Sequence, residues 1–152
     1  MILGIDPGAT GAVAVMSDNG YLIDLLDLPH IKGSGLSPQM LATALGEWDD
    51  VRHAFIERVA ARPGAGVSGM FNFGRDFGVI LGVCGAMAIP YSLATPSKWK
   101  RDLGLTADKD QARARASQLW PGAAKKFARK KDDGRAEAAL IALWGIKYGG
   151  GA

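Results

Sequence analysis

Two acidic residues follow apolar segments, where a carboxylate is costly to bury. Asp6 follows the apolar run 2–5, and Glu57 follows the apolar run 54–56. A buried carboxylate needs a bound cation, a basic partner or water. Both residues are therefore candidates for metal coordination. The alternatives are that Asp6 caps the turn after it, and that Glu57 pairs with Arg58 or faces solvent.

Further carboxylates stand at the start of a helix that we expect over about 135–148. Asp133 and Glu137 differ by about 40° around the axis of such a helix, so both project from one face. Asp132 is about 140° from Glu137 and is the weaker partner. The alternative is that Asp132 or Asp133 only caps the helix. Glu137 is harder to explain as a cap, because it stands within an alanine-rich apolar run.

Together these acids form a ligand set for hard divalent cations. Carboxylate oxygens suit Mg²⁺ or Mn²⁺, and two such ions about 4 Å apart can activate water and stabilise the leaving oxygen in phosphodiester hydrolysis. The two histidines, His30 and His53, are isolated and show no zinc-ligand spacing. We expect two Mg²⁺ or Mn²⁺ ions per active site. The expected catalytic residues are Asp6, Glu57, Asp133 and Glu137, and Asp132 is a further candidate metal ligand.

The elements that must position these residues are short and closely spaced. Turn signals separate the expected strands, and Ser37-Pro38 marks a helix start. The expected strands cover 1–8, 10–16, 21–28, 53–59 and 90–94, and the expected helices cover 38–48, 71–88, 109–119 and 135–148. This order predicts one α/β domain over 1–152, with a mixed sheet of three antiparallel strands then parallel strands, flanked by helices.

The helix expected over 71–88 carries four glycines at three- or four-residue spacing. Each costs about 1 kcal/mol relative to alanine in a helix. We expect the stripe to allow close backbone approach to the sheet or to another subunit. It consists of Gly74, Gly78, Gly82 and Gly85.

Composition and charge are those of a soluble globular protein with a polyanionic partner. Apolar residues make up 48% of the 152 residues, and no apolar run reaches the roughly 18 residues of a membrane helix. The start lacks a signal peptide and Cys84 has no partner cysteine, so we expect a cytoplasmic protein. Residues 97–131 carry a net charge of +8, against −4 in 1–96. This suits DNA held beside an acidic metal centre, and the alternative is a solvated basic helix face.

Several segments, in order along 1–148, carry a resemblance to the RuvC-like Holliday-junction resolvases. ILGIDPG at 2–8 resembles their first motif, FIE at 55–57 their second acidic strand, and DGRAEAAL at 133–140 their terminal acidic helix. GVSGMFNFGR at 66–75 and IPYSLATPSKWK at 89–100 look like phage-type relatives. Bacterial RuvC proteins space the last two acids three apart, whereas here the spacing is four. Asp133 and Asp132 therefore remain alternatives for the fourth acidic position.

The resemblance implies an RNase H-like fold and a metal-dependent crossover junction endodeoxyribonuclease that acts on branched DNA as a homodimer, with no nucleotide cofactor and no membrane association. In that family the region corresponding to 60–73 enters the junction. Basic and aromatic side chains in 60–75, 98–101 and 125–131 of this chain are candidates for phosphate contact and base stacking. The alternative for Phe71 and Phe73 is packing into the core. The candidate DNA-binding residues are Arg62, Phe71, Phe73, Arg75, Lys98, Trp99, Lys100, Arg101, Lys125, Lys126, Arg129, Lys130 and Lys131.

Three other functions compete with junction resolution. An RNase H-like nuclease acting on another branched, flap or RNA–DNA substrate would use the same acids. An actin-like or sugar-kinase-like phosphotransferase shares the fold and an early Asp-x-Gly turn, but duplicates the domain and needs about twice this length. A junction-binding module without catalysis would not need the acidic set.

Overall fold

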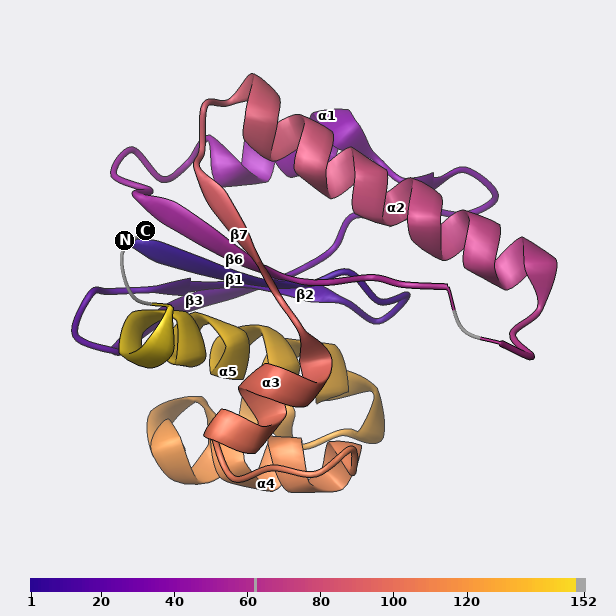
Figure 1. Cartoon of the computed structure of the whole chain (residues 1–152). Coiled ribbons are helices and arrows are strands. Elements are labelled where there is room, and N and C mark those ends of the chain that lie inside the picture. Colours follow the sequence, from indigo (N-terminus) through magenta and orange to yellow (C-terminus); the bar gives the residue numbers. More distant parts are fainter. Residues whose placement is uncertain (62, 150–152) are drawn as a thin grey trace.

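The chain is built on a central sheet of five strands (Figure 1). A computed structural model describes residues 1–61 and 63–149. The strand order is β3-β2-β1-β6-β7; the first three are antiparallel, and β6 and β7 continue parallel to β1. This confirms the expected mixed sheet. The strands are β1 (Ile2–Asp6), β2 (Ala12–Met16), β3 (Leu22–Asp27), β6 (His53–Glu57) and β7 (Tyr91–Ala94).

Helices cover both faces of the sheet and make three layers (Figure 1). One face packs against α1 (Pro38–Leu45) and α2 (Val67–Ala86). The other packs against α5 (Asp133–Tyr148), with α3 (Pro96–Asp102) beside α5 and α4 (Lys109–Leu119) on the outer side of α5. No helix in the described part of the chain is long and apolar enough to cross a membrane.

The alternation of side chains along β1 sends the site residue toward α5. Leu3 and Ile5 are fully buried in the core under α1 and α2, while Ile2 packs in the core that contains α5. Asp6 therefore faces the α5 side, since neighbouring strand residues alternate between faces. Gly4 lies under α5 itself: a Cβ there would meet the backbone oxygen of Ala138 at 2.1 Å. The missing side chain allows α5 to lie directly on β1.

The helix starts follow their capping signals. The side chain of Ser37 accepts a hydrogen bond from the backbone N–H of Met40, as the Ser-Pro signal predicts, and α1 ends at Leu45 rather than near Trp48. Thr95-Pro96 stands at the start of α3 with proline at the first helical position, but the Thr95 side chain makes no capping hydrogen bond, and no helix was expected there.

Several elements differ from the sequence expectation. The loop after β3 contains a small hairpin, β4 (His30–Ile31) and β5 (Gly35–Leu36), and α2 begins at Val67, four residues early. The basic segment forms two short 3₁₀ helices, η1 (Pro121–Phe127) and η2 (Lys130–Asp132). Two-residue strands and 3₁₀ turns are too short to leave a periodic pattern in the sequence.

The glycine stripe on α2 does not pack against the sheet. All four glycines are exposed, and a Cβ at any of them would meet nothing within 4 Å. The predicted close approach to the sheet is therefore wrong, because these glycines lie on the outer face of the helix. They are Gly74, Gly78, Gly82 and Gly85.

Candidate active site

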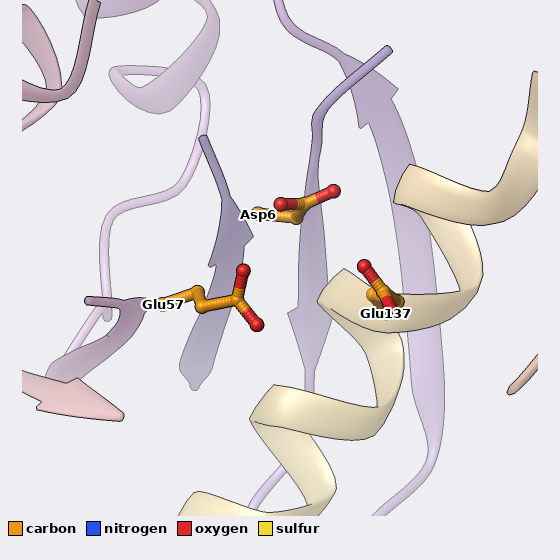
Figure 2. Close-up of side chains that lie close together, drawn as sticks. All are labelled: Asp6, Glu57 and Glu137. Atoms are coloured by element: carbon orange, nitrogen blue, oxygen red, sulfur yellow. The ribbon is translucent and has the colours of Figure 1, made fainter. Parts of the chain in front are cut away.

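Three buried carboxylates from three elements converge at one end of the sheet. Asp6 ends β1, Glu57 ends β6 and Glu137 lies on α5; each offers an oxygen within 4.8 Å of the others (Figure 2). Because β1 and β6 are parallel neighbours, their carboxyl ends reach the same edge of the sheet. The crossing of α5 over β1 brings the third carboxylate to that edge. Within the described residues this is the one cluster of three or more potential metal ligands.

The electrostatics of the cluster favour a bound cation. Burial, and next the neighbouring charges of Glu137 and Glu57, raise the pKa of Asp6 to about 8. The backbone N–H of Gly8 donates to Asp6 Oδ1 at 3.3 Å, which opposes the shift only partly. Three carboxylates at this separation repel one another when all are ionised. A divalent cation removes that repulsion, and oxygen-only ligands fit a hard ion.

Two lysines stand beside the acidic residues. Lys100 Nζ, on α3, donates to Glu137 Oε1 at 2.7 Å, and its side chain is 19% exposed. Lys109, at the start of α4, forms an ion pair with Asp133. The hydrogen bond that Lys109 donates to Asp133 is the main cause that raises the pKa of Lys109. The sequence offered no signal for Lys109 beyond its place in the positively charged segment.

Asp132 and Asp133 have different surroundings. Asp133 is buried, accepts a hydrogen bond from Thr10 Oγ1 at 3.2 Å, and pairs with Lys109 next to the cluster. Asp132 is instead held by Arg129, whose guanidinium lies 2.8 Å from Oδ1, and by Arg135 at 3.7 Å. The ion pair with Arg129 lowers the pKa of Asp132. Asp132 is thus paired with two arginines, and Asp133 remains the candidate for a fourth acidic ligand.

The segment 98–101 does not form one DNA-binding cluster. Trp99 is fully buried, and its indole N–H donates to Glu57 Oε1 at 3.0 Å, so its ring presents no surface to a base. Lys98 pairs with Asp102 at 2.9 Å. Arg101 is exposed, with a long contact of 3.5 Å to Asp102. Of these residues, Arg101 and Lys100 line the cleft described next.

The three clustered carboxylates line a cleft of about 750 Å³. Phe73, from the first half of α2, lines its wall together with Lys100, Arg101 and Lys109. The cleft thus presents an aromatic ring and basic groups in front of the carboxylates. It is lined by Asp6, Gly8, Ala9, Thr10, Glu57, Phe73, Pro96, Ser97, Lys100, Arg101, Leu105, Thr106, Ala107, Lys109 and Glu137.

The other candidate residues on α2 lie apart from this wall. Phe71 is 70% exposed, so it is not packed into the core. Arg75 is hydrogen-bonded through Nε and a terminal nitrogen to the buried Asp76, at 3.1 and 3.0 Å, which ties it to the β5 side of the helix. Arg62 falls outside the described residues.

The basic segment borders the cleft on its other side. All five of its predicted DNA-binding side chains are exposed. Arg129 and Lys131 line a small pocket that shares Ala9 and Thr10 with the acidic cleft. Lys126 lies 3.4 Å from Asp24, and Arg129 is paired with Asp132. Of this segment, Arg129 and Lys131 therefore lie near the acidic centre. The five residues are Lys125, Lys126, Arg129, Lys130 and Lys131.

Comparison with solved structures identifies the class of fold. RuvC of Thermus thermophilus in complex with a Holliday junction substrate superposes with a TM-score of 0.68 at 15% identity, covering 97% of this chain and 95% of that one. A second Thermus thermophilus RuvC structure gives a TM-score of 0.64 at 18% identity, covering 97% and 96%. The chain therefore has the RNase H-like fold of RuvC, and the resemblance seen in the sequence is confirmed at the level of the fold.

A comparison of sequences finds a similar relative. The chloroplastic Holliday junction resolvase MOC1 of Chlamydomonas reinhardtii is 31% identical over 126 residues. The match covers 78% of this chain but 14% of the relative, so the chain corresponds to a small part of that protein. No family model matches the sequence.

Proposed function

We propose that this protein is a divalent-metal-dependent endonuclease that resolves four-way (Holliday) junctions in DNA. The observation that carries the proposal is the convergence of Asp6, Glu57 and Glu137 at the edge of a RuvC-type sheet. The names of the relatives support the substrate, since both the Thermus thermophilus and the Chlamydomonas reinhardtii proteins are described with Holliday junctions.

The donor set fits Mg²⁺ or Mn²⁺, and we propose two ions per site. Bound there, the ions would supply an activated water and charge compensation at the leaving oxygen. Asp6, Glu57 and Glu137 would hold them, with Asp133 as the fourth acidic residue. Oxygen-only ligation by buried carboxylates is the chemistry that these hard cations require.

The lysines at the mouth of the site would bind the phosphate backbone. Lys100 and Lys109 are paired with Glu137 and Asp133 and line the cleft through which a phosphate must enter. When a cation takes over the carboxylates, both ammonium groups can turn to the substrate. Phe73 on the cleft wall, and the exposed Phe71 farther along α2, would stack on unpaired bases.

We propose that the protein acts as a homodimer through the outer face of α1 and α2. Symmetric resolution of a junction needs two active sites. The exposed glycine stripe lies beside a shallow apolar groove of about 430 Å³. The groove is lined by Pro38, Gln39, Ala42, Val79, Gly82, Val83, Ala86 and Met87.

Gly82→Glu tests this interface without a packing cost in the single chain, because nothing lies within 4 Å of a Cβ at this position. The variant should be monomeric in analytical ultracentrifugation and should lose paired cuts. A dimeric variant with unchanged paired cuts would place the interface elsewhere.

The substrate is tested by cleavage of a synthetic four-way junction with Mg²⁺ or Mn²⁺. Linear duplex, flap and RNA–DNA hybrid of matching sequence serve as controls. We expect two symmetry-related nicks in the junction and little cleavage of the other substrates. Preferential cutting of the flap or hybrid would assign the same centre to another branched or hybrid substrate.

A further inference from the structure

We propose that Trp99 is a positioning residue for the metal site, because its buried indole N–H donates to Glu57 Oε1 at 3.0 Å. The inference rests on the proposed function, since it concerns the same acidic centre. It replaces the expected contact between Trp99 and DNA.

The indole and the carboxylate each require a partner where they lie. Trp99 is fully buried and Glu57 is 8% exposed, within a core that includes Phe55 and Trp144. A buried indole has a single donor and finds an acceptor for it, and a buried carboxylate is costly without donors. The bond satisfies the indole N–H and gives one oxygen of the carboxylate a donor. It also restricts rotation of the Glu57 carboxylate, which ends a flexible side chain.

The helix that carries Trp99 is fixed to the rest of the fold. The indole N–H of Trp144, on α5, donates to Asp102 Oδ2 at 2.9 Å, and Lys98 reaches the same oxygen at 2.9 Å. The bond from Trp144 ties α3 to α5, and the bond from Lys98 holds Asp102 from within α3. The donor for Glu57 is thus mounted on a helix docked against the element that supplies Glu137.

Lys100, which follows Trp99 in the chain, contacts another carboxylate of the cluster, that of Glu137. Lys100 Nζ lies 5.1 Å from the ring centre of Trp99 while it donates to Glu137. Two consecutive residues of α3 therefore bind two of the three clustered acids. Their chemistry differs: the ammonium group of Lys100 competes with a metal cation for a negatively charged carboxylate, whereas the neutral indole of Trp99 does not. Hydrogen bonds of this kind orient metal-binding carboxylates, and losing one costs roughly 10–100-fold in metal affinity or activity.

Trp99→Phe removes the donor and keeps a large buried ring. Trp144→Phe is the matched control, because it removes an indole–carboxylate bond from the same core, to an aspartate outside the acidic cluster. We expect Trp99→Phe to weaken Mn²⁺ binding, measured without DNA by electron paramagnetic resonance, by roughly 10–100-fold. Trp144→Phe removes one contact between α3 and α5 but no hydrogen bond to the acidic cluster, so it should lose clearly less Mn²⁺ affinity than Trp99→Phe. Wild-type affinity in a folded Trp99→Phe protein, or equal losses in both variants, would overturn the inference.

A second measurement uses the wild-type protein, so its result does not depend on the folding of a variant. In the ¹⁵N-labelled wild-type protein, the indole N–H resonance of Trp99 should shift on Mg²⁺ titration with the midpoint of metal binding, and that of Trp144 should stay in place. A Trp99 resonance that ignores the metal would overturn the proposal. If the wild type binds Mn²⁺ and shows this shift but cuts no junction, the proposed substrate fails while the role of Trp99 stands.

Discussion

The carboxylates of Asp6 and Glu137 offer ligand oxygens within 4.8 Å of each other, although one residue ends the first strand and the other lies on the last helix. Gly4 makes this approach possible. A Cβ at Gly4 would lie 2.1 Å from the backbone oxygen of Ala138 and 2.5 Å from the backbone nitrogen of Ala142. The metal site therefore depends on the direct contact between the backbones of β1 and α5.

Gly4→Ala should lower both stability and activity. The added methyl group meets backbone atoms that cannot rotate away, so α5 must shift on the sheet and carry Glu137 with it. Overpacking of this kind costs about 1–3 kcal/mol of unfolding free energy. Urea unfolding and junction cleavage would measure the two effects. Gly122→Ala is the control, because nothing lies within 4 Å of a Cβ there; equal behaviour of the two variants would contradict the close-contact account.

Without divalent cations, the unfolding free energy should fall as pH rises from the unfolded pKa of Asp6, 3.8, to its folded pKa of about 8, and should level off above that pH. The pKa of Asp6 is raised from 3.8 to about 8 by burial and then by Glu137 and Glu57. Asp6 keeps its proton in the folded protein where the unfolded chain loses it. This stabilisation is complete below the unfolded pKa and is lost as pH rises through the folded pKa.

Urea titrations in chelator at a series of pH values would compare the wild type with Asp6→Asn. The variant should lack the decline, and Mg²⁺ should remove it from the wild type by binding the ionised carboxylates. Identical pH profiles for the two proteins in chelator would show that Asp6 titrates normally.

Asp133→Asn should weaken metal binding more than Asp132→Asn does. Asp133 adjoins the cluster through Thr10 and Lys109, whereas Asp132 is paired with Arg129. We expect a loss of roughly tenfold or more in Mn²⁺ affinity for Asp133→Asn. Asp132→Asn should mainly lower the unfolding free energy, by breaking a buried ion pair. A larger loss of Mn²⁺ affinity in Asp132→Asn would reverse the assignment.

The basic segment should supply the part of DNA binding that does not depend on structure or sequence. Each lysine that neutralises a phosphate releases counterions and contributes about 0.9 to the log–log salt slope. Replacing Lys125, Lys126, Lys130 and Lys131 with alanine should weaken junction and duplex binding alike and flatten that slope. Fluorescence anisotropy at several salt concentrations would measure it, with Lys32→Ala/Lys147→Ala as the control. An unchanged slope in the quadruple variant would mean that these lysines are a solvated face.

The acidic centre could be predicted because its residues contradict their surroundings. Asp6 and Glu57 stand next to apolar strand residues, and Glu137 interrupts an alanine-rich helix, so each signals a function beyond packing. Turn residues and short apolar runs indicated an α/β domain that starts with an antiparallel meander, whereas the RNase H-like fold followed from the resemblance. Helical spacing already favoured Asp133 over Asp132 as the fourth acidic residue, and the pairing of Asp132 with Arg129, which spacing does not contain, supports that preference.

Other features depend on which way a helix faces, and the sequence does not show this. The regular spacing of the α2 glycines suggested close packing, but they face outward, while Gly4, which belongs to no such pattern, lies directly under the backbone of α5. Trp99 stands among basic residues and resembles a surface group, yet α3 turns its ring into the core. Lys109 reaches Asp133 only because α4 packs beside α5.

Cleavage of one four-way junction at saturating Mn²⁺ by the wild type and by Asp6→Asn, Glu57→Gln and Glu137→Gln tests the central claim most directly. Each amide keeps the shape of the side chain but removes the charge that binds a cation. Loss of a metal ligand should exceed the roughly 10–100-fold cost of losing an outer hydrogen-bonding partner, while folding and junction binding persist. The account predicts paired nicks from the wild type and none from the variants. Wild-type cleavage by any one of the three folded variants would remove that carboxylate from the active centre and contradict the account.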